Sequence, residues 1–504
     1  MANDVSLDKR QFQCKGGAEH DPLCVFPNPD DPSQSSYQHP RVELALPESP
    51  SAPAPAQHQV PAEILIEIFS RASSLDTSCC IFDIRHHSWT ISQVCRSWRS
   101  VSTSMCPAMW SKIDIDFNGD LDELRGKRDP ISMLRTVLSR SGQHVLDIEF
   151  LMSYRAEEPF QWAMWEQVAA HAERWSKIYH TLGHQEPSHL ACLRGRLVQL
   201  EECYIQRDYN HPGPSPDLID AFEHTPKLKR MTLVGLGPTT LVPVSYANLE
   251  TFKDQRRHWH ASDAIHTYFI SLLHHSPKLT EFHTSYHCVG AHAAWPRISK
   301  PAITYFSGCE ETLFHSLSLP QLKHANLFRT LEDIAGCLGD FHDLLSHSQC
   351  HTLTHLSISD VHLNESLLPI FRLSPALASF SVRVRARDWH ISDDDSVQSL
   401  FRHLLESPEL VPRLESITFD LVLWYEWSRV FFFNQEMVDM IEARRASSLR
   451  KFQVTSTFSD YGVDTFCDWT DDDLRRLHKM KAGGFDVAIV AYPYHEPEER
   501  RIYV

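Results

Sequence analysis

Residues 411–421 read VPRLESITFDL, and this short stretch holds the pattern that decides the fold. A turn containing Pro412 is followed by Leu414, and then by apolar residues at every second position, Ile417, Phe419 and Leu421. This alternation is typical of a β-strand that buries one face. Because proline disfavours helical geometry in the residue before it, the stretch marks the end of a preceding helix and the start of a strand.

The same order, Pro-x-Leu followed by alternating apolar residues, recurs along most of the chain. The first leucines lie about 20 to nearly 40 residues apart, whereas a regular solenoid keeps a period of about 20 to 29 residues. We therefore expect uneven curvature and inserted loops. Strong copies contain Pro226, Pro277, Pro320 and Pro375, and weaker copies begin at Leu146, Leu249, Leu353 and Leu449.

Amphipathic helices are expected before several of these turns. Ser262, Ser396 and the pair Ser215-Pro216 are placed to begin three of them. A last helix over 471–479, capped by Thr470, leads to a final strand over 485–490. The sequence thus predicts an α/β fold in which a small N-terminal helical module precedes an irregular leucine-rich-repeat-like solenoid of parallel strands with outer helices.

The N-terminal module is expected over 58–112, where two apolar stripes have helical spacing. Pro61 is suited to begin the first helix, because a backbone N–H at that position would have no partner within the helix, so nothing is lost by its absence. A bundle this small cannot bury both stripes alone, so part of the surface must meet the repeats or a partner. The stripes are Ile64, Leu65, Ile68 and Phe69, and then Ile91, Val94, Cys95, Trp98 and Val101.

Three motifs in this segment resemble the F-box, a helical module of adaptor proteins. The opening motif is Val60-Pro-Ala-Glu-Ile-Leu65, in which Val60 replaces the usual leucine. The second is Val94-Cys-Arg-Ser-Trp-Arg99, and the closing one is Pro107-Ala-Met-Trp110. The stretch from Arg71 to Trp89 is longer than the minimal module needs, and its polar part from Ser73 to Cys80 is expected to be a loop.

This resemblance implies docking on the Skp subunit of a cullin-based ubiquitin ligase and, through Skp, on cullin. The repeats would then hold a target protein that the sequence does not name. The sequences of Phe222–Leu228 and Ser139–Gly142 also resemble those of mushroom-group fungal proteins that join an F-box to degenerate leucine-rich repeats. The docking residues implied are Pro61, Glu63, Ile64, Leu65, Ile68, Phe69, Val94, Cys95, Trp98, Arg99 and Trp110.

Composition limits the other possibilities. Residues 1–57 hold nine prolines and are expected to form a disordered tail, followed by the module over 58–112 and the repeats over 113–504. A net charge of −17 argues against nucleic-acid binding. No apolar run is suited to a signal peptide or a membrane span. The 13 scattered cysteines fit reduced thiols, and hence the cytoplasm or nucleus.

Catalysis has little support, and neither a cofactor nor a metal site is predicted. Histidines crowd between His258 and His292, and His283 and His287 have helical spacing, but a metal site needs three or four ligands. A metal-dependent hydrolase on this stretch stays an alternative, as does a repeat scaffold acting outside ubiquitination. The acidic triplets 393–395 and 471–473 are expected in first helical turns. The aromatic segment 424–433 is expected in the core.

Overall fold

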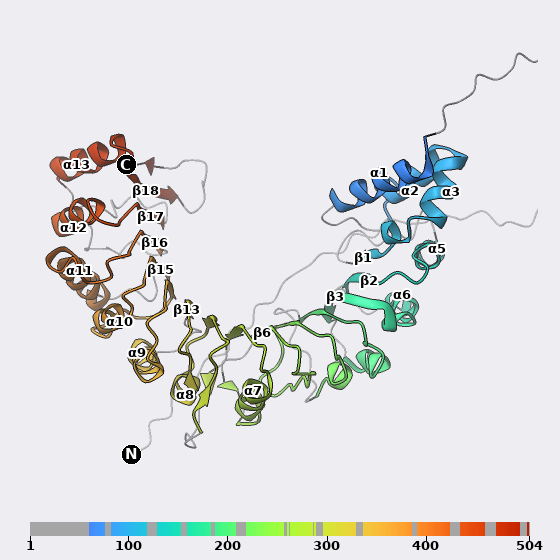
Figure 1. Cartoon of the computed structure of the whole chain (residues 1–504), viewed down its shortest axis with the longest axis horizontal. Helices are drawn as coiled ribbons and strands as arrows, with labels where there is room; N and C mark the ends of the chain where they lie inside the picture. Colours follow the sequence, from blue (N-terminus) through green and yellow to red (C-terminus); the bar gives the residue numbers. More distant parts are fainter. Residues whose placement is uncertain are drawn as a thin grey trace, which may run out of the picture. The chain divides into compact units, whose positions relative to one another are not determined.

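The computed structural model shows an α/β protein in which residues 60–504 form one compact unit (Figure 1). The tail expected over 1–57 and the aromatic segment 424–433 lie outside the described residues. The structure describes residues 60–75, 82–117, 129–152, 159–182, 187–207, 218–256, 260–261, 263–285, 287–288, 296–328, 336–385, 391–423, 434–458, 470–493, 501–502 and 504.

One sheet of fifteen strands runs through this unit, and two short strand pairs accompany it (β7 with β9, β10 with β12). Every neighbouring pair in the large sheet is parallel except β18 with β19. In sheet order the strands are β1 Lys112–Asp116, β2 Leu146–Leu151, β3 Trp175–Leu182, β4 Glu202–Arg207, β5 Arg230–Val234, β6 Thr251–Gln255, β8 Glu281–Thr284, β11 Tyr305–Ser307, β13 His324–Phe328, β14 His355–Ser359, β15 Ser379–Arg385, β16 Ser416–Leu423, β17 Lys451–Phe458, β18 Asp486–Pro493 and β19 Arg501–Ile502; the short pairs are β7 His260–Ala261, β9 His287–Cys288, β10 Ile298–Ser299 and β12 Leu317–Ser318.

The helices that follow β1 line one side of the sheet in chain order (Figure 1). The predicted solenoid-like α/β architecture with a large parallel sheet is therefore confirmed. The helices are α1 Ala62–Leu75, α2 His87–Val94, α3 Arg96–Ser104, α5 Pro130–Arg140, α6 Pro159–Ala169, α7 Asp263–His275, α8 Glu311–Ser316, α9 Cys337–Ser348, α10 Leu367–Leu373, α11 Ile391–Glu406, α12 Gln435–Arg445 and α13 Asp471–Ala482, with 3-10 turns η1 Pro107–Trp110, η2 Ala172–Arg174, η3 Pro187–Leu193 and η4 Asp220–Phe222.

The proline-containing turns set the register of the strands. The Leu228 N–H donates to the Thr225 carbonyl across Pro226 at 3.0 Å, and Leu228 itself is fully buried. From β4 to β16 of the large sheet, one carbonyl just before each strand accepts two backbone N–H groups from the next repeat. The Lys323 carbonyl, for example, accepts from Thr354 at 2.8 Å and His355 at 2.9 Å. Because these bonds satisfy backbone groups that would otherwise be buried unpaired, the repeats are held in one alignment.

Four parallel strands of the large sheet were not predicted, because none follows a strong Pro-x-Leu turn: β1, β3, β4 and β11. Before β4 the pattern is Leu200 followed by Cys203 and Ile205, which keeps the apolar spacing but lacks the proline. Before β11, Ile303 occupies the leucine position. The interior of the solenoid accepts these residues, since Leu200 and Ile303 are both fully buried. Size and apolar character decide that position, so a search based on proline and leucine misses copies.

One of the three predicted helix starts differs from the structure, and the other two lie outside the described residues. α11 begins at Ile391 rather than at Ser396, whose hydroxyl instead donates to the Leu363 carbonyl at 3.3 Å. Phe222 lies in the short η4, not in an α-helix, and the pair 215–216 lies outside the described residues. Ser262 also lies outside them. α11 contains the first acidic triplet within its first five residues, as expected.

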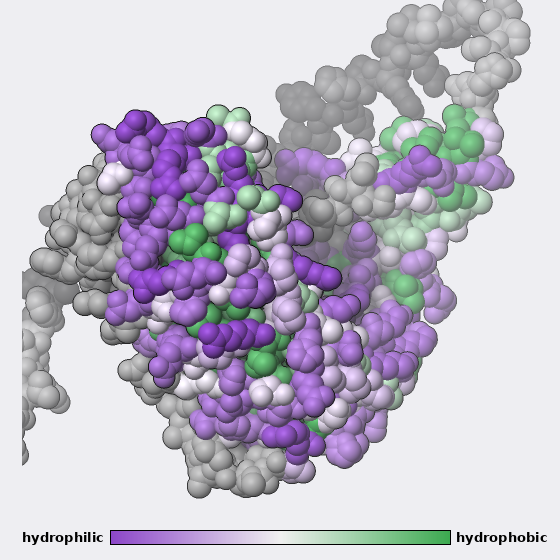
Figure 2. Space-filling view, turned by 60° about the vertical axis from the view of Figure 1, so that its left-hand side comes forward, coloured by the Kyte–Doolittle hydropathy of each residue, from purple (hydrophilic) through white to green (hydrophobic). Residues whose placement is uncertain are grey.

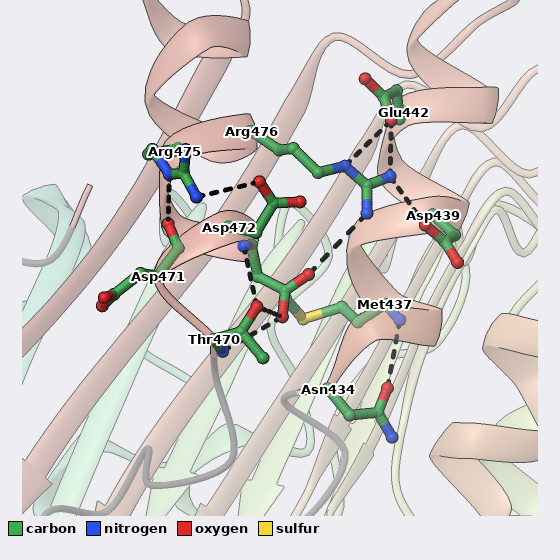
Figure 3. A network of polar contacts seen from close by, with 10 residues as sticks. Asn434, Met437, Asp439, Glu442, Thr470, Asp471, Asp472, Arg475 and Arg476 are labelled. Carbon is green, nitrogen blue, oxygen red and sulfur yellow. Dashed lines mark hydrogen bonds and ion pairs between the residues drawn. The ribbon is translucent and has the colours of Figure 1, made fainter.

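The predicted last helix, capped by Thr470, is confirmed. Thr470 forms a capping box with Asp473, and all three aspartates of the triplet lie in the first turn of α13 (Figure 3). Arg476 of the same helix donates to Asp439 of α12 at 2.7 Å and to Glu442 at 2.5 Å, which joins two consecutive helices. These carboxylates raise the pKa of the Arg476 guanidinium. The array then ends with β18 and one antiparallel strand, β19, beyond the predicted final strand.

One apolar core is continuous from Leu65 in α1 to Val504, across the predicted boundary between 112 and 113. Along the strands, buried side chains alternate with half-buried ones, as in β2, where Leu146, Ile148 and Phe150 are buried. The half-buried residues between them lie on the other side of the sheet. This side, which faces away from α5–α13, is called the open face below.

Candidate functional site

Exposed apolar side chains gather on the N-terminal helices. Of the eight large apolar residues that are exposed in the described part of the chain, five lie between residues 60 and 105. Ile64 and Ile68 lie four residues apart in α1 and therefore share one face of the helix, and Val60 lies just before its start. Figure 2 shows apolar surface at its upper right, over these helices. The exposed fractions are 47% for Val60, 52% for Ile64, 47% for Ile68, 57% for Val94 and 51% for Met105.

The opposite side of α1 belongs to the core. Leu65 is 2% exposed and Phe69 is fully buried. The Phe69 ring lies edge-to-face on the half-buried Trp98 ring of α3, with 5.1 Å between centroids. The prediction that Ile64, Leu65, Ile68 and Phe69 share one face is therefore wrong. Successive helical positions differ by about 100°, so the apolar arc spans two faces, and the fold covers one of them.

The second predicted stripe is divided between two helices. Cys95 is extended, with φ −157° and ψ 174°, and separates α2 from α3. Its Sγ accepts from the Trp98 backbone N–H at 3.4 Å, and Arg99 Nε donates to the Ser92 carbonyl at 2.9 Å. A single continuous face from Ile91 to Val101 is therefore not formed. Cys95 and Arg99 hold the junction of the two helices, and Val94 is left exposed at the end of α2.

Trp110 is the anchor between these helices and the first repeat. Its ring is 2% exposed, its indole N–H donates to the Ser102 carbonyl at 2.8 Å, and the Trp89 ring meets it edge-to-face at 5.3 Å. The Arg140 guanidinium of α5 lies 4.5 Å from the centroid of the Trp110 ring. Burial, together with the charge of Arg99, lowers the pKa of Arg140. Trp110 therefore contributes to the junction from inside, and its ring offers little surface to a partner.

Pro61 and Glu63 are exposed at the start of α1. The Pro61 carbonyl accepts the first helical bonds, from Ile64 at 3.1 Å and from Leu65 at 3.2 Å. Glu63 lies in the first turn, where a negative charge is favourable. α1 extends to Leu75, so the loop expected from Ser73 begins later, and residues 76–81 lie outside the described part.

A second candidate surface is a pocket of about 480 Å³ where the N-terminal helices meet the open face of β1–β5. Tyr179 and Tyr204 on its floor are stacked 4.2 Å apart, and both hydroxyls donate to Gln206 Oε1 at 3.0 Å. Burial, with Asp114 and Asp116 nearby, raises the pKa of Glu149. Charges alternate across the strands in the pairing order Lys112, Asp147, Lys177, Glu202 and Arg230.

The histidine-rich stretch does not form the helical pair that its spacing suggests. His283 lies in β8 and His287 in β9, and the side chain of His287 lies outside the described residues. His283 stacks on Tyr305 with 4.6 Å between centroids. Burial, and then the charge of Lys253, lower the pKa of His283 to about 4. This histidine is therefore neutral at physiological pH and belongs to an aromatic stack on the open face.

A further cluster, which the sequence analysis missed, joins two outer helices. Glu311 and His315 of α8 and Asp340 of α9 each direct one potential metal-ligand atom to a common region. The spacing of Glu311 and His315 is visible in the sequence, but the third residue comes from the next helix. Only the pairing of repeats brings it close.

Comparison with protein-family models finds no match, and no curated protein matches the chain. The resemblance noted above therefore rests on the three motifs. None of the helices in the described part of the chain has the length and apolar character needed to cross a bilayer.

Proposed function

We propose that the protein is a substrate-recognition adaptor of a Skp–cullin–F-box ubiquitin ligase. The observation that carries the proposal is the exposure of Val60, Ile64 and Ile68, the first two of which lie in the motif that resembles an F-box opening and the third one helical turn after Ile64. Large apolar side chains that share one exposed helical face are typical of a docking surface. Val94, exposed at the start of the second motif, adds to the same group of helices.

In this proposal the implied docking residues divide into two sets. The outer set contacts the Skp subunit, and the inner set holds the helices in place. Apolar interfaces draw most of their binding energy from a few anchors, so Ile64 and Ile68 should dominate. The outer set is Pro61, Glu63, Ile64, Ile68 and Val94; the inner set is Leu65, Phe69, Cys95, Trp98, Arg99 and Trp110.

The repeats in this proposal form a degenerate leucine-rich-repeat domain whose open face holds the target. Supporting this role are the pocket beside Tyr179 and Tyr204 and the polar side chains that follow the strands across the open face. An adaptor needs no acid–base groups of its own, because it accelerates ubiquitin transfer by holding a target lysine close to the loaded enzyme.

The docking surface is tested with the full chain carrying Ile64→Glu and Ile68→Glu. Both side chains are about half exposed, so the fold should tolerate the charges, while an apolar interface should not. Capture of a purified Skp-family subunit should weaken at least tenfold. Val198→Glu is the matched control, since Val198 is 41% exposed in the repeats. Equal capture by the double variant and the control would contradict the docking assignment.

A deletion of residues 58–112 is a weaker test than point variants. It would remove Trp110 and the strand start at Lys112, and thereby open the core at β1. Loss of capture by such a deletion would not separate docking from unfolding.

The adaptor and the scaffold alternative differ in what is captured with Skp. Cullin should co-purify with the intact chain and be lost with the double variant if the protein serves a ligase. Capture of Skp without cullin would instead support a repeat scaffold that acts outside ubiquitination.

A further inference from the structure

Two consecutive outer helices bring three potential metal ligands together. His315 Nε2 lies 3.8 Å from Glu311 Oε1 within α8, and 3.6 Å from Asp340 Oδ1 of α9. The three ligand atoms all lie within 4.8 Å of one another. The donors are therefore one imidazole and two carboxylates, and they come from two helices that belong to successive repeats.

The separations match those of a small coordination sphere. Zinc binds imidazole nitrogen and carboxylate oxygen at roughly 2.0–2.2 Å, so two ligands of a tetrahedral site lie about 3.3–3.6 Å apart. The two distances from His315 Nε2 are at or just above this range. Small rotamer changes in Glu311, whose side chain is 40% exposed, would complete the arrangement. The fourth position would be left to water.

The surroundings concentrate negative charge at this place. The Asp340 side chain is 18% exposed, and the neighbouring Glu310 is buried. Burial, followed by the charge of Glu311, raises the pKa of Asp340 to about 6, with Asp343 and Glu310 adding to the effect and His315 opposing it. A divalent cation would relieve the repulsion among these carboxylates.

The backbone also makes room for the Asp340 carboxylate. Gly336, which precedes α9, has no side chain, and a Cβ at this residue would lie 3.2 Å from Asp340 Oδ2. The carboxylate is thus held back against the start of its own helix, where it faces α8.

We propose that Glu311, His315 and Asp340 bind a zinc ion, which links α8 to α9. The imidazole favours zinc over magnesium or calcium, because those hard cations prefer sites made of oxygen ligands. The zinc ion would stabilise α8, because this helix is only six residues long and a helix this short has little stability alone. This site lies outside the histidine-rich stretch and is independent of the proposed docking function.

The test is zinc titration of the full chain after removal of metal with a chelator. Calorimetry should show one saturable site, and the melting temperature should rise with zinc but not with magnesium. Cobalt substitution should give the visible absorption of a tetrahedral site. His315→Ala and Asp340→Asn should each weaken zinc binding at least tenfold and abolish the cobalt absorption.

The control pair lies on the same helix. His342 and Asp343 of α9 contact each other at 3.1 Å but belong to no three-ligand group in the described residues. His342→Ala should therefore leave zinc affinity unchanged, which separates the site from adventitious binding to the other histidines. Melting of the variants without zinc shows whether they fold. Equal zinc affinity in His315→Ala and His342→Ala, or no saturable binding in the intact chain, would overturn the proposal.

Discussion

Similar apolar stripes are partly exposed in the first helix of the compact unit but buried in the helices of the repeats. In α7, Ile265, Phe269 and Leu272 are all fully buried against the sheet and the neighbouring repeats. In α1, Ile64 is 52% and Ile68 is 47% exposed. A helix inside the array has a neighbouring repeat on either side, whereas a terminal helix has one. The comparison shows that, in the described part of the chain, apolar side chains remain exposed at the N-terminal end of the array.

The largest expected effect on stability comes from truncating a side chain on the buried side of α1, compared with the same truncation on its exposed side. Phe69→Ala should lower the free energy of unfolding by about 3–5 kcal/mol, because it removes a fully buried ring that contacts Trp98. Ile64→Ala should change it by no more than about 0.5 kcal/mol, as expected for an exposed site. Chemical denaturation of both variants measures the difference. Equal losses would mean that Ile64 is covered and that the contrast with α7 is false.

The closed interior of the repeats predicts a pH dependence. His180 is fully buried, with Nδ1 3.0 Å from the Phe150 carbonyl oxygen, and burial lowers its pKa from 6.5 to about 4. The unfolded chain therefore takes up a proton that the folded chain resists. Stability from this group is fully present above pH 6.5 and falls as the pH drops toward 4, by at most about 3 kcal/mol.

Denaturation of the intact chain and of His180→Phe between pH 4 and 7 measures this contribution. The variant should lose part of the pH dependence, although its stability at pH 7 also changes because hydrogen bonds to Phe150 and His189 are removed. His144→Phe, at an exposed position, should retain the dependence of the intact chain. Identical pH profiles for all three proteins would show that His180 is open to water.

The smallest expected effect concerns the other end of the array. Thr470→Ala removes the capping box of α13 and should cost about 1 kcal/mol (Figure 3). Thr470→Ser, which keeps the hydroxyl, should restore most of it. Thermal melting of the two variants checks this order. A loss as large as that of Phe69→Ala would mean that the C-terminal helix is as critical to the core as the N-terminal one.

Sequence patterns located much of the array in advance. The turns at Pro226, Pro277, Pro320, Pro375 and Pro412 each precede a strand of the large sheet, and Thr470 caps the last helix. Strands β1, β3, β4 and β11 were missed because the Pro-x-Leu pattern is incomplete before each of them: β4 follows Leu200 without a proline, and β11 follows Ile303 in place of a leucine. The break at Cys95 was missed because periodicity continues across it while the backbone turns extended.

The sequence by itself determined the alternation of helix, turn and strand, because periodicity and proline geometry act within a few residues. It also showed apolar stripes in α1 without indicating which side would be covered. Only the tertiary structure decided that Leu65 and Phe69 are enclosed while Ile64 and Ile68 face outward, and that Asp340 meets Glu311 and His315. Exposure and ligand convergence depend on which elements become neighbours, and residues distant in the chain meet only when the repeats stack.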